Sequence, residues 1–262
     1  MPRIEPTLVP VVTDLERGLR ELGISFAVIG ALVPELLLDA RPARMTNDAD
    51  VTVVVESLAD FETLKDRLAD FGFTRTRLPY RMQHGSGGLA DILPCSESIA
   101  PNGRLQLEEG FVFNMAGFGQ VVPHALPTPI EGGPTLPLAP LPLYALLKLV
   151  AFSDRQEPKD LAGVFHCLEH YLEDDDRRYD VEHHGEGVPY EYTCAYLLGA
   201  DGRRFLDKPL SEAVSGVLDR FSDPDADVIG IVAREKGRVV IKDEERTEIF
   251  EHFRWYRVGA RL

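Results

Sequence analysis

Two aspartates that lead directly into a run of β-branched residues constrain the fold of this chain most strongly. Residues 46–50 read Thr-Asn-Asp-Ala-Asp, and residues 51–55 read Val-Thr-Val-Val-Val. A β-branched run bounded by a charged turn favours a strand. Side chains alternate between the two faces of a strand, so Asp48 and Asp50 should point the same way, with Thr52 beyond them.

Carboxylates side by side on one face repel each other, and a bound divalent cation removes that repulsion. Mg²⁺ takes oxygen ligands, typically one or two carboxylates together with the phosphates of a substrate. The pair therefore indicates a place where a metal and a phosphate group meet. The alternative is a solvated strand end at which the aspartates have no function, and the pair alone favours neither interpretation.

A third acid, Asp91, lies in the short apolar segment 89–93, immediately after the glycine-rich turn 84–88. A carboxylate in the middle of such a strand is costly to bury unless it is paired, hydrogen-bonded or bound to a metal. If this segment lies beside the Asp48 strand, three carboxylates converge on one metal cluster. Such a cluster suits phosphoryl or nucleotidyl transfer, since metals bridge phosphate oxygens and neutralise developing charge.

Composition narrows the class of protein. The chain has 262 residues, enough for one large domain or two smaller ones, and a net charge of −15 that argues against a general nucleic-acid binder. Local basic patches at Arg75, Arg77 and Arg81, or at Arg254, Arg257 and Arg261, are conceivable, but solvated surface arginines are the simpler interpretation.

We expect a cytoplasmic protein without a membrane segment, because the start lacks a signal-peptide pattern and the longest apolar stretch is broken by prolines. Three widely spaced cysteines indicate neither a disulfide framework nor a zinc ribbon.

Hydrophobic periodicity predicts an α/β first half and a mostly helical second half. In the first half we predict helices at 11–22, 31–38 and 58–71, and strands at 24–29, 48–55, 73–82, 89–93, 111–114 and 120–123. In the second half we predict a charged loop at 173–187, helices at 190–198, 210–221 and 244–256, and either a helix or a strand at 228–232.

Several motifs occur in the order found in a known family. Ile29-Gly30-Ala31 precedes a short helix, Arg44-x-Thr46-x-Asp48-Ala49-Asp50-Val51 follows, and Asp91 comes later. This order resembles the polymerase-β type nucleotidyltransferase superfamily. The stretch from Leu143 to Arg155, followed by Lys159-Asp160-Leu161, resembles its AbiEii-type branch, which includes toxins of toxin–antitoxin and abortive-infection systems.

The resemblance implies an α+β fold: a nucleotidyltransferase-like mixed sheet flanked by helices in residues 1–138, and a mostly helical C-terminal domain in residues 139–262. It implies that Asp48, Asp50 and Asp91 bind Mg²⁺ or Mn²⁺, with Asp91 completing the metal site or acting as base. The resemblance also implies that Gly30, Ala31 and Thr46 bind the nucleotide. It implies that Lys148 neutralises phosphate charge and that Asp160 positions or activates the acceptor. The substrate would be a nucleoside triphosphate (NTP). The acceptor would be an RNA such as a tRNA, a protein or a small molecule. If the chain is a toxin, it would have a cognate antitoxin protein.

Ala31 stands where the family usually has Gly or Ser, and Gly163 stands where it usually has a second Asp. These departures motivate an alternative hypothesis, a catalytically inactive binding or regulatory protein built on the same fold. We also expect the acidic site to lie in a cleft between the two domains, where Lys148 and Asp160 approach Asp48 and Asp50.

A rival hypothesis comes from another chemical class. Residues 166–170 read His-Cys-Leu-Glu-His, which fits the H-x-x-E-H string of inverted zinc metalloproteases. His166 and His170 share a helix face, and Glu169 lies beside them as a candidate base. Because a five-residue string arises easily by chance, we favour a helix that simply carries both histidines on its surface.

Overall fold

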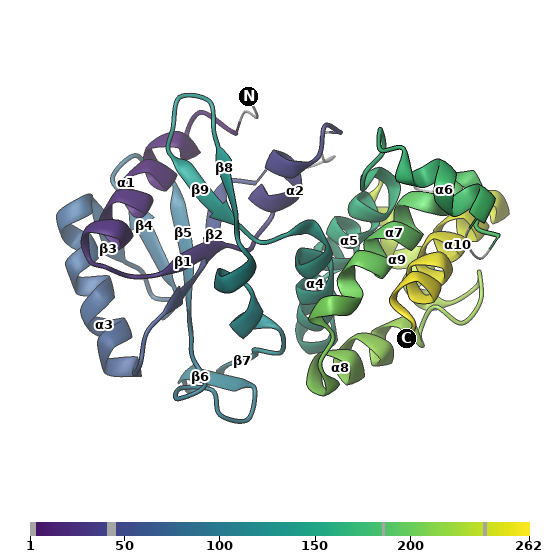
Figure 1. The fold of residues 1–262 in the computed structure, drawn as a ribbon. Helices are drawn as coiled ribbons and strands as arrows, with labels where there is room; N and C mark the ends of the chain where they lie inside the picture. The colour runs from purple at the N-terminus through teal and green to yellow at the C-terminus, as the bar shows by residue number, and fades with distance from the viewer. Residues whose placement is uncertain (1–3, 41–45, 185–186, 238–239) are drawn as a thin grey trace. The chain divides into compact units, whose positions relative to one another are not determined.

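The computed structural model describes residues 4–40, 46–184, 187–237 and 240–262 (Figure 1). The chain divides into two compact units, one formed from the described parts of 1–37 and 44–140, and the other from 141–262 together with residues 38–40. The first unit has an α+β fold and the second is helical, as the sequence predicts.

The first unit is built on a seven-stranded mixed sheet in the order β3-β4-β5-β2-β1-β9-β8. Its elements are α1 (Leu8–Glu21), β1 (Phe26–Val28), α2 (Leu32–Leu37), β2 (Asp48–Val54), α3 (Leu58–Arg67), β3 (Phe73–Arg75), β4 (Arg81–His84), β5 (Leu89–Cys95), β6 (Arg104–Glu108), β7 (Phe111–Asn114), β8 (Leu126–Pro129) and β9 (Thr135–Leu138), with short 3₁₀ helices η1 (Leu68–Phe71), η2 (Phe118–Gln120) and η3 (Val122–His124). β6 and β7 form a separate two-stranded sheet.

β2 and β5 carry the three aspartates that the sequence analysis singles out. These two strands pair in parallel, whereas β1 pairs with β2 and β4 pairs with β5 in antiparallel fashion. β1 and β9 form a second parallel pair. α1 packs on β2 and on η1, and its buried face consists of apolar residues at helical spacing, including Val11, Leu15 and Leu19. α1 therefore covers β2 on one face of the sheet.

The second unit contains only helices among its described elements. They are α4 (Leu141–Arg155), α5 (Pro158–His170), α6 (Arg177–His184), η4 (Tyr190–Tyr192), α7 (Thr193–Gly202), η5 (Arg203–Phe205), α8 (Lys208–Leu218), α9 (Asp227–Glu235) and α10 (Asp243–Ala260). α7 and α10 pack closely: a methyl group on Gly199 or Gly259 would collide with the backbone of the facing helix. No helix in the described ranges is long and apolar enough to cross a membrane.

Three predictions of local structure are wrong. Residues 73–82 form two antiparallel strands rather than one, because the Thr76 hydroxyl accepts a hydrogen bond from Leu78 N at 3.1 Å and the chain turns there. Residues 120–123 run from the end of 3₁₀ helix η2 through a turn at Val121 into 3₁₀ helix η3, rather than forming a strand. The predicted loop 173–187 contains α6, which Arg178 anchors through hydrogen bonds to Thr193 Oγ1 at 2.9 Å and to Glu173 O at 2.6 Å.

Candidate metal centre

The aspartates of β2 lie on one half-exposed face of the sheet. Along this strand Asp48 and Asp50 are partly exposed, whereas Ala49 and Val51 between and beyond them are buried. This is the alternation expected of a strand that has a packed face and a wetter face. Thr52 continues the same face and is buried, its hydroxyl donating a hydrogen bond to Leu93 O of β5 at 3.1 Å.

The parallel pairing of β2 with β5 brings in the third acid. Asp50 lies opposite Asp91 in the register, and Ala49 lies opposite Ala90. Neighbouring strands lie about 4.8 Å apart, so side chains at matching positions on one face are in reach of each other. One carboxylate oxygen each from Asp48, Asp50 and Asp91 lies within 4.8 Å of the others. The structure thus brings together the three acids that the sequence singles out.

Gly30 makes room for this cluster. The glycine follows β1, and a methyl group on its Cα would collide with the carboxylate of Asp50. Ile29 N donates a hydrogen bond to Asp50 O at 2.9 Å, which fixes the two segments side by side. Any larger residue at position 30 would displace the Asp50 side chain. The roles of Gly30 and Ala31 in binding phosphate stay predictions, and the α2 helix that follows them has only six residues.

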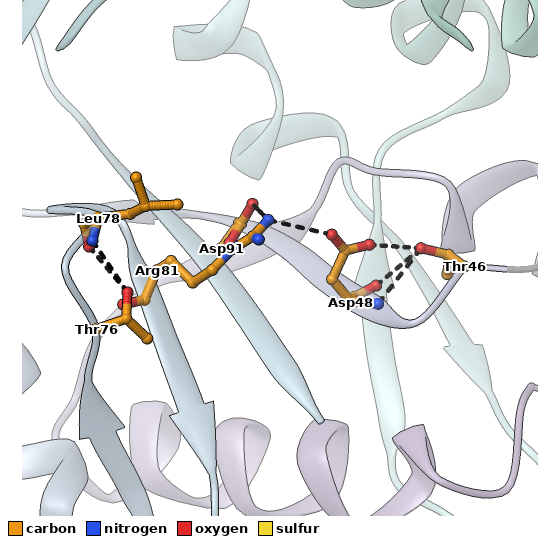
Figure 2. A network of polar contacts seen from close by, with 6 residues as sticks. All are labelled: Thr46, Asp48, Thr76, Leu78, Arg81 and Asp91. Atoms are coloured by element: carbon orange, nitrogen blue, oxygen red, sulfur yellow. Dashed lines mark hydrogen bonds and ion pairs between the residues drawn. The ribbon is translucent and has the colours of Figure 1, made fainter. Parts of the chain in front are cut away.

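Thr46 orients the first aspartate. Its hydroxyl donates a hydrogen bond to Asp48 Oδ1 at 2.6 Å, so the carboxylate is held on one side while its second oxygen faces Arg81 (Figure 2). Thr46 therefore acts on Asp48, whereas its predicted contact with a nucleotide stays a prediction. Arg44 of the same motif lies outside the described residues.

Arg81 contacts the aspartate cluster, and the sequence pattern did not single it out as part of this site. Its Nε and Nη2 donate hydrogen bonds to the two carboxylate oxygens of Asp91 at 2.6 and 2.7 Å, and Nη2 lies 3.4 Å from Asp48 Oδ2 (Figure 2). Arg81 on β4 lies opposite Asp91 on β5 in the register. The sequence signal was weak, because the β4–β5 turn length must be known before Arg81 and Asp91 can be aligned.

The guanidinium group of Arg81 changes the electrostatics of the aspartate cluster. Its hydrogen bonds to Asp91 are the main cause that raises the pKa of Arg81 above its ordinary value, and the charges of Asp91 and Asp48 act in the same direction. The guanidinium therefore stays cationic and bridges two of the three carboxylates. A divalent cation that binds all three acids would compete with this pairing.

Lys148 and Asp160, also predicted as site residues, belong to the second unit. Lys148 Nζ on α4 lies 3.1 Å from Asp160 Oδ1 on α5, and Arg155 donates two hydrogen bonds to the same carboxylate at 2.6 and 2.7 Å. Burial raises the pKa of Asp160, but the hydrogen bonds from Arg155 and the charge of Lys148 outweigh it, so the pKa is lowered. Asp160 has no solvent exposure. The observed contacts join α4 to α5, and the roles of both residues on phosphate and acceptor stay predictions.

Gly163 has a local structural explanation. A methyl group at this position would lie 2.6 Å from the Tyr144 hydroxyl oxygen, so the glycine on α5 leaves space for the buried tyrosine of α4. The side chain that the nucleotidyltransferase motif usually carries here would not fit unless Tyr144 moved.

Comparisons with known proteins add little. No protein-family model matches the chain, and no curated protein matches it. Among solved structures, an antigenic nucleotidyltransferase-like protein from Paracoccidioides brasiliensis is similar, with a TM-score of 0.44 and 14% sequence identity over 87% of this chain and 94% of that chain. This similarity is too low to assign a family.

Proposed function

We propose that the chain is a metal-dependent nucleotidyltransferase that moves a nucleoside monophosphate group from an NTP to an acceptor. One observation carries the proposal: Asp48, Asp50 and Asp91 each offer a carboxylate oxygen within 4.8 Å of the other two. They do so on a half-exposed face of a sheet, where an ion and a substrate have access from solvent.

The donor set fits a hard divalent cation such as Mg²⁺ or Mn²⁺. All three donors are carboxylates, and Arg81 already bridges two of them as a positive charge. Asp48 and Asp50 would hold the ion, with Asp91 as a third ligand or as base. When bound, the ion would neutralise charge on phosphate oxygens and favour ionisation of an attacking hydroxyl.

In the proposed reaction, each residue of the cluster has its own role. An acceptor oxygen attacks the α-phosphorus, the bond from that phosphorus to the α,β-bridging oxygen breaks, and pyrophosphate leaves with the bond electrons. The proton of an acceptor hydroxyl passes to Asp91 or to solvent. Thr46 keeps Asp48 in position through its 2.6 Å hydrogen bond, and Gly30 keeps Asp50 in position by leaving it space. Released from Asp91, the Arg81 guanidinium becomes available to phosphate oxygens.

The finer parts of the proposal rest on the sequence motifs. They include Lys148 and Asp160 as groups that act on phosphate and acceptor, an RNA such as a tRNA as one class of acceptor, and a toxin role with a cognate antitoxin. An antitoxin gene beside the gene for this chain would support the toxin role.

The experiment supplies each α-³²P-labelled NTP with Mg²⁺ or Mn²⁺ to the full chain, together with total cellular RNA or protein extract, and follows label transfer and pyrophosphate release. We expect transfer by the native chain and none by the Asp48→Asn/Asp50→Asn variant. Asp70→Asn, which alters an exposed carboxylate of the same unit, should retain it. Absence of NTP binding and of transfer across all acceptors and metals would contradict the proposal.

A second candidate is a non-catalytic binding or regulatory protein. The two hydrogen bonds between Arg81 and Asp91 favour it, because they satisfy one of the three carboxylates without a metal. This alternative predicts that the native chain transfers no label. It also predicts that the Asp48→Asn/Asp50→Asn variant does not differ from the native chain in metal binding or in label transfer.

A further inference from the structure

We propose that α5 carries a second metal site, formed by His166, Glu169 and His170, that takes a late first-row divalent transition metal such as Zn²⁺. These residues lie at positions i, i+3 and i+4 of the helix, so their side chains share one face. One ligand atom from each lies within 4.8 Å of the others, and the two imidazole rings are 4.9 Å apart between centroids. The site lies in the helical unit, whereas the three aspartates belong to the sheet unit.

Each histidine has one ring nitrogen engaged by an acceptor. His166 Nε2 lies 3.1 Å from Ala40 O, and His170 Nδ1 lies 2.8 Å from Glu173 Oε2. A carbonyl or a carboxylate can only accept, so these nitrogens carry the ring protons. The lone pairs are then on His166 Nδ1 and His170 Nε2. Histidines that bind metals almost always donate their other N–H to a carbonyl or a carboxylate in this way.

The carboxylate of the site is also held in place. Lys236 Nζ, just beyond α9, lies 2.7 Å from Glu169 Oε1, and the same ammonium lies 4.5 Å from the centroid of the Phe165 ring. The second carboxylate oxygen is the one that a metal would take. Since the side chains of His170 and Glu169 are 28% and 21% exposed, an ion reaches them from solvent without opening the helical unit.

The neighbouring thiol is not part of the site. Cys167 follows His166 in α5, but its side chain is fully buried and does not share the helix face of His166, Glu169 and His170. The donors are therefore two nitrogens and one oxygen.

This donor set selects a different ion from the aspartate cluster. Imidazole suits Zn²⁺ and other late first-row ions, whereas carboxylates alone suit Mg²⁺ and Mn²⁺. Three protein ligands leave at least one coordination position of a tetrahedral ion open to water or to a group from a partner. The arrangement gives the H-x-x-E-H string a metal-binding role without assigning it a protease activity.

The test is equilibrium dialysis of the metal-free full chain against micromolar Zn²⁺ at neutral pH, with bound metal measured by mass spectrometry. We expect about one equivalent of tightly bound Zn²⁺. His170→Ala and Glu169→Gln should each lose it, whereas Asp48→Asn/Asp50→Asn should retain it. His170 is chosen for substitution because its side chain is 28% exposed, and circular dichroism checks the fold of each variant.

A further variant tests the contact between His170 and Glu173, which orients the imidazole. Glu173→Gln removes the carboxylate that orients His170 and should weaken Zn²⁺ binding by about 10- to 100-fold. Glu212→Gln, at an exposed position of α8, should leave it unchanged. Equal Zn²⁺ binding by the native chain, His170→Ala and Glu169→Gln would overturn the proposal. So would absence of binding by the native chain, or loss of the bound Zn²⁺ in Asp48→Asn/Asp50→Asn.

Discussion

At the scale of single residues, Gly30 and Asp50 depend on each other. Gly30→Ala forces a methyl group into the Asp50 carboxylate, so we expect a loss of about 1–3 kcal/mol in the free energy of unfolding together with weaker Mn²⁺ binding. Urea denaturation and a Mn²⁺ titration measure the two effects. Gly216→Ala on α8 is the matched control, because a methyl group there meets nothing within 4 Å, and it should be neutral or stabilising. Equal effects of the two substitutions would contradict this account of Gly30.

Arg81 gives a second prediction at this scale. In metal-free buffer, Arg81→Gln removes the cation that bridges Asp91 and Asp48 and should lower the free energy of unfolding by about 1.5–3 kcal/mol. Mn²⁺ should reverse most of this loss, since the ion takes over the same carboxylates. Arg75→Gln, which breaks exposed ion pairs with Glu62 and Asp66 and an exposed hydrogen bond to Glu62 O, should cost about 1 kcal/mol with no response to Mn²⁺. A loss in Arg81→Gln that Mn²⁺ leaves unchanged would show that Arg81 has no part in the metal site.

At the scale of elements, the ion pairs of Asp160 connect α4 to α5. The pKa of Asp160 lies below its ordinary value of 3.8, so the ionised carboxylate contributes stability above that pH and loses the contribution as the pH falls toward the folded pKa. Asp160→Asn should cost about 2 kcal/mol at neutral pH, because Lys148 and Arg155 lose their charged partner. The difference between native chain and variant should narrow as the pH falls below 3.8 toward the folded pKa. Urea denaturation at each pH measures it, and a constant difference would contradict this role.

Elements also show what the sequence can and cannot predict. The Asp48 strand, the turn at 84–88 and the segment 111–114 were predicted because their β-branched, glycine-rich or aromatic patterns are local. The β8–β9 hairpin was missed because Pro127, Pro129 and Pro137 lie within its strands, and prolines argue against strands away from a sheet edge. The charged helix α6 was missed because it has no apolar stripe and depends on Arg178 for its contacts.

Some residues of the candidate site can be predicted from the sequence, and others cannot. Period-two alternation alone predicts that Asp48 and Asp50 face the same side of a strand, and the cost of a carboxylate in an apolar strand singles out Asp91. Arg81 could not be predicted, since its place beside Asp91 follows from the antiparallel register of β4 and β5. The contact of Gly30 with Asp50 depends on the path of the chain after β1, which no local pattern encodes.

At the scale of the whole molecule, the two candidate metal sites belong to separate compact units. We therefore expect different ions to protect different segments in hydrogen exchange. Mg²⁺ should slow exchange in β2 and β5, and stoichiometric Zn²⁺ should slow exchange in α5, each with little effect on the other segments. Protection of α5 by Mg²⁺, or equal protection of all three segments by either ion, would contradict two independent sites.

The most direct test of the central claim is binding of Mn²⁺ to the full chain followed by electron paramagnetic resonance, because it needs no knowledge of the acceptor. The Asp48–Asp50–Asp91 cluster predicts that the native chain removes the signal of free Mn²⁺ and that Asp48→Asn/Asp50→Asn loses this ability, while His170→Ala retains it. Native affinity for Mn²⁺ in the Asp48→Asn/Asp50→Asn variant would contradict the assignment of a metal centre to these aspartates.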